Sequence, residues 1–123
     1  MEKNDTTNAI NRENLNRICM LHTALGKIEG RWKPALIMKI HKGFTRFGKL
    51  KLTLSGISEK MLAQQLKELE QDGLVSKTIF PEVPPRTEYA LTERGQELQQ
   101  LLDQLCNWGL AHFSGEKMAT PLE

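Results

Sequence analysis

The sequence predicts a mostly α-helical fold with one small β-hairpin, an α+β architecture in a single domain. Apolar residues recur at helical spacing in five segments of the chain. Between residues 74 and 91 the pattern changes to two short runs of β-branched and aromatic residues, separated by a segment with three prolines. A chain of 123 residues can bury a core of its own without disulfides or metals.

The N-terminal half is expected to contain three helices. The first spans about residues 12–28, and its apolar face is formed by Ile18, Leu21, Leu25 and Ile28. The second spans residues 32–41, with Pro34 in its first turn, where a missing N–H has no helical partner. The third is a short helix over residues 44–54.

A tight turn joins the third helix to a fourth. Residues 54–58 read Leu-Ser-Gly-Ile-Ser, and the hydroxyl of Ser58 is expected to cap a helix over residues 59–72. The apolar stripe of that helix consists of Met61, Leu62, Leu66 and Leu69. Gly73 follows at the position where a left-handed residue commonly closes a helix.

The C-terminal half is expected to form a hairpin and a long helix. Residues 74–80 and 86–91 are predicted strands, and the proline-rich segment 81–85 forms their tip, because proline lacks an N–H donor and fixes φ. Thr92 is expected to cap a last helix over residues 93–113. Its apolar residues are Leu98, Leu101, Leu102, Leu105 and Trp108.

This order of elements predicts a winged helix-turn-helix with N- and C-terminal dimerisation helices. A short helix, a glycine-containing turn and a capped helix form the helix-turn-helix, and the hairpin forms the wing. In such motifs the second helix enters the major groove of DNA. The first and last helices carry more apolar surface than one small domain needs, which favours a two-fold homodimer. The domain is expected to span residues 12–113, with flexible tails at 1–11 and 114–123.

The charge distribution favours an anionic partner. Residues 31–60 contain eight basic residues and one acidic residue, whereas residues 61–123 contain five basic and ten acidic residues. The whole chain has a net charge of only +2. A basic segment in a nearly neutral protein is typical of a localised anion-binding surface, and the alternative is a solvated lysine-rich surface.

The candidate residues for binding double-stranded DNA come from three parts of the motif. On helix 59–72, glutamine can pair with adenine, lysine can reach guanine or phosphate, and the free N–H groups behind the cap can bind phosphate. The preceding short helix crosses the DNA backbone, and a wing arginine contacts phosphate or enters the minor groove. In chain order the candidates are Thr45, Arg46, Lys49, Ser58, Lys60, Gln64, Gln65, Lys67, Lys77 and Arg86.

Several other classes of protein have little support in the sequence. No apolar run approaches the ~20 residues of a membrane span, and residues 1–11 lack the apolar core of a signal peptide. We therefore expect a cytoplasmic protein. The two cysteines, Cys19 and Cys106, are too far apart for a zinc motif or a disulfide scaffold. No phosphate-binding loop or nucleophile motif occurs, so we expect no enzyme, no cofactor and no metal.

Several motifs together carry a resemblance to a known family. They are Cys19, Ala24-Leu25, Gly30-Arg31-Trp32-Lys33, Arg46-Phe47-Gly48-Lys49-Leu50, Gly56-Ile57-Ser58, Met61-Leu62, Gln65-Leu66-Lys67-Glu68-Leu69, Asp72-Gly73-Leu74-Val75, the wing segment Pro81 to Tyr89, Leu91-Thr92 and Trp108-Gly109. Over roughly residues 15–113 the chain resembles the HxlR-type winged-helix regulators of bacteria. The resemblance implies a transcriptional regulator whose dimer packs helices from both chain ends together and binds pseudopalindromic operators.

Two further hypotheses stay open at this point. Some HxlR-type regulators sense oxidants or electrophiles through a cysteine at the position of Cys19, and the alternative for this residue is a buried core position. Here Met20-Leu21-His22 follows the cysteine, not the Cys-Pro start common in the family. A winged-helix module that binds protein would instead show an apolar or acidic outer face on helix 59–72. The sequence identifies no small-molecule effector.

Overall fold

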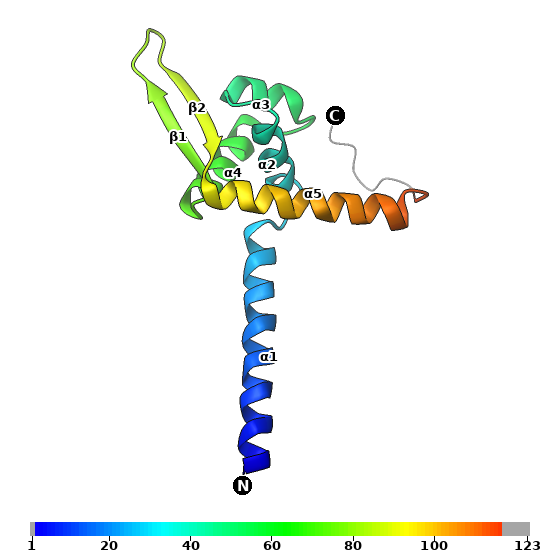
Figure 1. The fold of residues 1–123 in the computed structure, drawn as a ribbon. Helices are drawn as coiled ribbons and strands as arrows, with labels where there is room; N and C mark the ends of the chain where they lie inside the picture. The colour runs from blue at the N-terminus through cyan, green and yellow to red at the C-terminus, as the bar shows by residue number, and fades with distance from the viewer. Residues whose placement is uncertain (1, 117–123) are drawn as a thin grey trace.

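The computed structural model describes the backbone of residues 2–116 and the side chains of residues 8–116. The elements follow one another as predicted, with two strands between the fourth and fifth helices (Figure 1). In chain order they are α1 (Glu2–Lys27), α2 (Lys33–His41), α3 (Phe47–Thr53), α4 (Glu59–Gln71), β1 (Val75–Phe80), β2 (Arg86–Leu91) and α5 (Glu93–Phe113). The α+β winged-helix prediction is confirmed.

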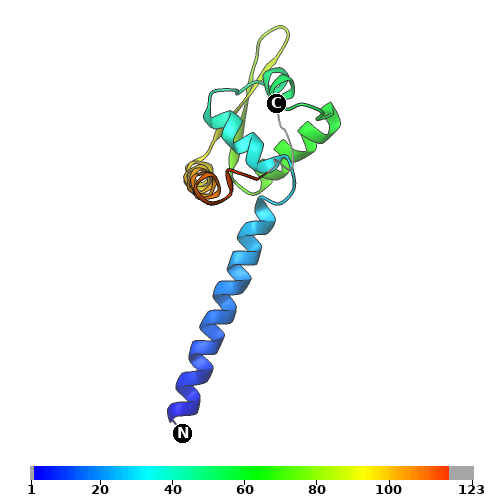
Figure 2. The ribbon, with the colours of Figure 1, turned by 90° about the vertical axis from the view of Figure 1, so that its right-hand side faces the viewer.

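Helix α2 is the centre of the core. It packs against α3, α4, α5 and β2, and the view along α5 shows it surrounded by these elements (Figure 2). Its buried residues Leu36, Ile37 and Ile40 belong to one apolar core cluster with residues from each of these neighbours. The other core residues are Leu50, Leu54, Ile57, Leu62, Leu66, Leu69, Leu74, Val75, Tyr89 and Leu102. Burial of these side chains is the main source of stability for the helix-turn-helix.

Hydroxyl caps and left-handed glycines set the boundaries of the helices. The Ser58 side chain accepts a hydrogen bond from the Met61 N–H, and Thr92 does the same for Gly95, as predicted. Gly56 has a φ of 86° in the turn before α4, and Gly73 has a φ of 73° after it. These are conformations that side chains disfavour and glycine adopts freely.

The hairpin is antiparallel, and a third segment of chain is joined to the middle of β2. Its register runs from Val75 opposite Leu91 to Phe80 opposite Arg86. Just before α3, Arg46 forms an isolated antiparallel bridge with Glu88, and the Tyr89 N–H donates to the Thr45 carbonyl over 2.8 Å. The wing is therefore attached to the start of the helix-turn-helix by backbone hydrogen bonding.

This attachment explains why α3 is shorter than predicted. The expected helix spans residues 44–54, whereas α3 begins at Phe47. Arg46 has the extended conformation of a strand (φ −92°, ψ 143°). Pairing with the wing, a contact 42 residues distant in sequence, overrides the helical pattern of the local residues.

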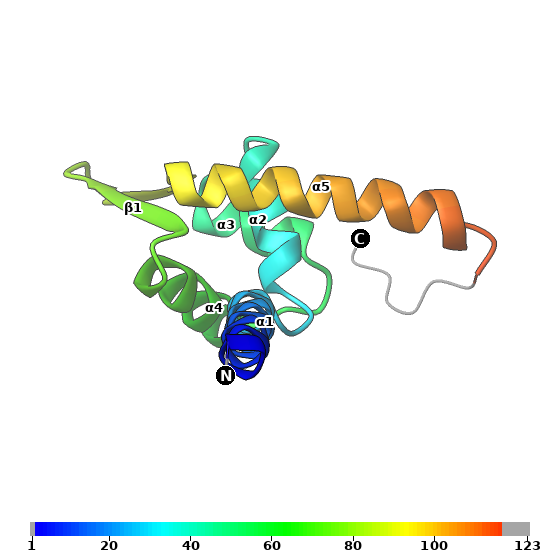
Figure 3. The same ribbon diagram turned by 60° about the horizontal axis from the view of Figure 1, so that its bottom comes forward.

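Helix α1 projects from the domain. Figures 1 and 2 show it extending away from the other elements, and Figure 3 shows it nearly end-on. Its 26 residues correspond to about 39 Å at 1.5 Å per residue. At its C-terminal end the Lys27 ammonium lies 3.1 Å from the Asp72 carboxylate, which follows α4. The helix begins at Glu2, not at residue 12, because residues 2–25 contain neither glycine nor proline to end it.

Helix α5 has the predicted bounds but buries less of its apolar face than a core helix would. Leu102 is buried, whereas Leu101, Leu105 and Trp108 are each more than half exposed. Residues 114–116 continue beyond the helix as a turn, and the rest of the predicted C-terminal tail, residues 117–123, lies outside the described residues.

Candidate nucleic-acid interface

The N-terminal end of α4 is open to solvent. Ser58 is exposed, and its hydroxyl accepts from the third N–H of the helix, that of Met61, at 3.0 Å. The neighbouring Glu59 and Lys60 are also exposed. Free N–H groups at a helix start, together with the positive end of the helix dipole, attract anions. This end of α4 can therefore receive a phosphate group.

The predicted outer face of α4 carries the expected polar side chains. Lys60, Gln64 and Lys67 are exposed, and they recur at spacings of four and three residues, which places them on one face of a helix. Gln65 is only half-buried, and its Nε2 donates to the Met61 sulfur at 3.5 Å. Gln65 thus lies at the flank of this face, as expected.

The segment before α3 and the start of that helix present two exposed cations and one hydroxyl that is hydrogen-bonded to the wing. Arg46 is exposed, with its Nε 3.8 Å from a Glu88 oxygen, and Lys49 is exposed on α3. Thr45 is half-buried, and its hydroxyl donates to Glu88 at 3.4 Å. Thr45 therefore contributes to the attachment of the wing, while Arg46 and Lys49 keep their charges accessible.

Arg86 is held inside the wing by three contacts. Its guanidinium lies 3.2 Å from Glu82 and 3.0 Å from Glu88, and it stacks over the Phe80 ring at 4.1 Å. Its Nε lacks hydrogen-bond alignment toward Glu88, so the contact is an ion pair. Two carboxylates thus surround the predicted wing arginine, whereas Lys77 on β1 is exposed.

A cleft separates the wing tip from the start of α3. Its lining includes Arg46, Gly48 and Arg86, together with the prolines of the tip. The two arginines lie within 4 Å of the same oxygen of the Glu88 carboxylate, Arg46 at 3.8 Å and Arg86 at 3.0 Å. The structure therefore brings together predicted residues from the helix-turn-helix and from the wing.

The basic segment 31–60 does not form a single face. Lys33 is buried, and its ammonium lies 2.6 Å from Glu68 of α4. Lys39 and Lys42 line an apolar groove between α2 and α5. The basic segment is thus divided between the helix-turn-helix surface, the interior and the α5 side of the domain.

The Lys33–Glu68 ion pair was not predicted. The side chain of Lys33 is 10% exposed and that of Glu68 is 37% exposed. Hydrogen bonding from the Lys33 ammonium, and then from the Gln64 amide, lowers the pKa of the Glu68 carboxyl. No sequence pattern relates residues that lie 35 positions apart, so only the fold reveals this pair.

Neither cysteine is part of the core. Cys19 and Cys106 are both exposed free thiols, so the alternative that Cys19 is buried within its own chain is wrong. Its carbonyl accepts a hydrogen bond from the Thr23 hydroxyl within α1. In the part of the chain described, no cluster of three His, Cys, Asp or Glu side chains could hold a metal ion.

Comparison with known proteins identifies the family. The family model of the HxlR-like helix-turn-helix matches residues 27–117. The chain belongs to the HxlR-like family. An uncharacterized HTH-type transcriptional regulator of Methanothermobacter thermautotrophicus is 37% identical to this HxlR-like chain over 100 residues, 81% of this chain and 76% of the relative.

Solved structures agree with the HxlR-like assignment. A MarR-family transcriptional regulator from Enterococcus faecalis superimposes with a TM-score of 0.73 at 39% identity, covering 79% of this chain and 88% of that one. The redox regulator HypR in its reduced form gives a TM-score of 0.70 at 36% identity, covering 74% and 90%. This HxlR-like protein is therefore a transcriptional regulator of the winged helix-turn-helix type.

A membrane-spanning helix requires both length and apolarity. None of the helices in the described segment, residues 2–116, is both long and apolar enough to cross a bilayer. Even α1, the longest helix, has a polar composition over most of its length.

Proposed function

We propose that this protein binds a specific sequence of double-stranded DNA as a homodimer. The observation that carries the proposal is the outer face of α4, where Lys60, Gln64 and Lys67 are exposed behind an open helix N-terminus. An α-helix fits the major groove, where glutamine and lysine distinguish base edges. An apolar or acidic face, which a protein-binding module would need, is not what these side chains provide.

Contacts to the DNA backbone supplement this face. Arg46 and Lys49 at the start of α3 and Lys77 on the wing are exposed cations, and their accessibility supports a role for each in contacting phosphate. Arg86 reaches a phosphate or the minor groove by exchanging one of its two carboxylate partners, Glu82 or Glu88, for the DNA backbone. Each phosphate contact releases counterions and makes the affinity dependent on salt.

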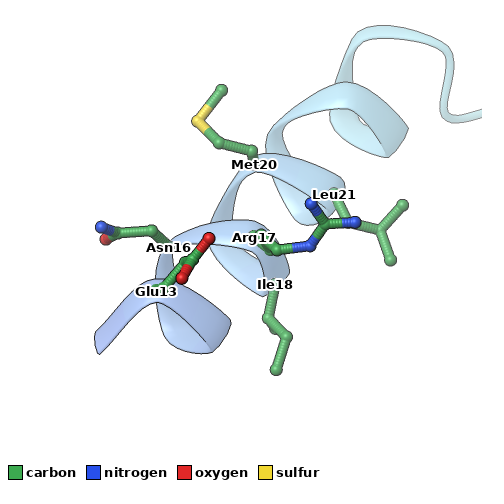
Figure 4. A pocket seen from close by; sticks show the side chains of 6 residues that line it. All are labelled: Glu13, Asn16, Arg17, Ile18, Met20 and Leu21. Atoms are coloured by element: carbon green, nitrogen blue, oxygen red, sulfur yellow. The ribbon is translucent and has the colours of Figure 1, made fainter. Parts of the chain in front are cut away.

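The homodimer is inferred from apolar side chains that one chain leaves exposed. On α1, Leu15, Ile18, Leu21 and Leu25 are each at least 50% exposed. A shallow depression on α1 is lined by residues of this helix alone, and Figure 4 shows their side chains extending outward from it. A second set of exposed apolar side chains belongs to α5. It consists of Leu101, Leu105 and Trp108, and an apolar groove lies between α2 and α5. Exposed large apolar residues that gather along two helices are typical of an interface.

The experiment that tests the proposal is selection of random duplex DNA on the purified protein. Enrichment of a pseudopalindrome, with half-sites about one helical turn or roughly 34 Å apart, is the expected result for a two-fold dimer. Weak binding of all sequences alike, with no enrichment, would reject sequence-specific recognition. That result would favour the alternative that this winged-helix domain binds a protein partner.

A second candidate function is thiol-based sensing, which would add to DNA binding. Cys19 is exposed on the same helix as the apolar residues of the inferred interface, so its modification would act directly on dimer geometry. The similar protein HypR is described as a redox regulator. Alkylation of the Cys106→Ser variant, whose remaining thiol is Cys19, tests this function. Loss of operator binding would support sensing, and unchanged binding would reject it.

A further inference from the structure

A chain of polar contacts connects the interior of the domain to the outer face of α4. Lys33, the first residue of α2, is buried, and its ammonium lies 2.6 Å from Oε1 of Glu68. The other oxygen of this carboxylate, Oε2, accepts a hydrogen bond from Nε2 of Gln64 at 3.2 Å. Each carboxylate oxygen therefore has a different partner.

Burial of Lys33 fixes the position of Glu68. A buried ammonium without a counter-charge is strongly unfavourable, so the lysine keeps the carboxylate within contact distance. In the described residues, the partner within ion-pair distance of this ammonium is Glu68. The carboxylate is thus held on one side of α4, and its negative charge is largely neutralised before it can repel a DNA phosphate.

The fixed carboxylate in turn determines which way the Gln64 amide faces. An ionised carboxylate only accepts hydrogen bonds, so the NH₂ end of the amide must turn toward Glu68 and the carbonyl oxygen must turn away. Oε1 and one N–H of Gln64 are then left for an outside partner. A carbonyl and an N–H in that order are the groups that glutamine uses to bind adenine through two hydrogen bonds.

We propose that Lys33 and Glu68 are positioning residues that orient the Gln64 amide for base recognition. This inference rests on the proposed DNA-binding function. The Gln64 amide, which contacts the base, is already held in its orientation in the free protein. Ordering a side chain in advance reduces the conformational entropy lost on binding. It also favours one amide orientation, and hence one base, over the alternative flipped orientation.

The test uses the full-length protein and an operator obtained by selection. Gln64→Ala identifies the base pair that Gln64 reads, as the position where discrimination is lost. Glu68→Gln replaces a carboxylate, which only accepts hydrogen bonds, with an amide, which both donates and accepts. The Gln64 amide can then adopt either of its two orientations. We expect Glu68→Gln to reduce discrimination at that base pair by roughly tenfold, the order of one bidentate contact. Glu70→Gln, an equal change of charge at an exposed position of α4, is the matched control.

The lysine is tested through the same base pair. Lys33→Met should reduce discrimination there, and Lys33→Arg, which retains the cation, should restore most of it. Circular dichroism confirms that each variant is folded. If Lys33 and Glu68 act through Gln64, the double variant Glu68→Gln/Gln64→Ala should discriminate no worse than Gln64→Ala alone. A purely structural role would instead lower affinity for all sequences equally.

Each remaining outcome overturns the inference in a recognisable way. Full discrimination in Glu68→Gln, or additive losses in the double variant, would reject the positioning role while DNA recognition stands. A Gln64→Ala protein that discriminates normally at every base pair would also reject the positioning role, because Gln64 would then read no base. Failure of the wild-type protein to enrich any sequence would reject the proposed function itself, and this inference with it.

Discussion

Replacement of Gly95 by alanine is expected to destabilise the protein, although alanine is the better helix former. Gly95 lies in the first turn of α5, where a Cβ would meet the Leu74 carbonyl oxygen at 2.0 Å. Real Cβ contacts do not fall below 3.0 Å, so α5 and the start of the wing must separate by at least 1.0 Å. The Thr92 N–H donates to the same carbonyl over 3.1 Å, and the shift would strain this hydrogen bond.

The magnitude follows from three opposing contributions. Overpacking costs about 1–3 kcal/mol, and the strained hydrogen bond adds about 0.5–1.5 kcal/mol. The helical preference of alanine over glycine returns up to about 1 kcal/mol. The expected net loss is about 0.5–4.5 kcal/mol. For a chain of this size, it corresponds to a decrease in Tm of roughly 2–17 °C.

Thermal denaturation followed by circular dichroism, at a fixed protein concentration, measures this loss. Gly48→Ala is the control, because Gly48 is also helical and a Cβ there meets nothing within 4 Å. It should be neutral or slightly stabilising. A Gly95→Ala protein as stable as Gly48→Ala would refute the reasoning, since the contact between α5 and Leu74 would then not be tight.

Three further predictions concern charge and assembly. Lys60→Ala should weaken DNA binding and reduce the salt slope of log K by about one, which titrations at several salt concentrations measure; an unchanged slope would remove Lys60 from the interface. Leu21→Glu should convert the proposed homodimer to monomers in sedimentation experiments, whereas the same change at Leu52, which is 81% exposed on α3, should not. A Leu21→Glu protein that still forms dimers would exclude this face of α1 from the interface. Because Lys33 lowers the pKa of Glu68, the ionised pair stabilises the fold at neutral pH. The Tm difference between wild type and Glu68→Gln should shrink as the pH falls below about 4.3 and Glu68 becomes protonated. A Tm difference independent of pH would contradict this stabilising role of the ion pair.

Local signals in the sequence were sufficient for most of the fold. Hydroxyl residues before apolar repeats located the starts of α4 and α5, because a cap is a contact within four residues. The same reasoning failed where distant contacts decide. The segment before α3 is extended because it pairs with the wing, and no local pattern encodes that pairing.

The candidate site was predictable only in its composition. Helical periodicity placed Lys60, Gln64 and Lys67 on one exposed face of α4, as observed. Periodicity could not reveal that Lys33 is buried against this helix, or that Arg86 is surrounded by carboxylates. A count of basic residues treats every lysine and arginine alike, whereas burial and ion pairing decide which of them can meet a phosphate.

The attachment of the wing to the segment before α3 has a consequence for local opening. The Tyr89 amide is hydrogen-bonded to Thr45, outside the hairpin itself, so it exchanges with solvent only when β2 separates from that segment. Residues 81–85 at the tip are all exposed and can open without disturbing this anchor. A longer or shorter tip would therefore change how far the wing extends. The anchored part of the wing, and its distance from α4, would stay the same.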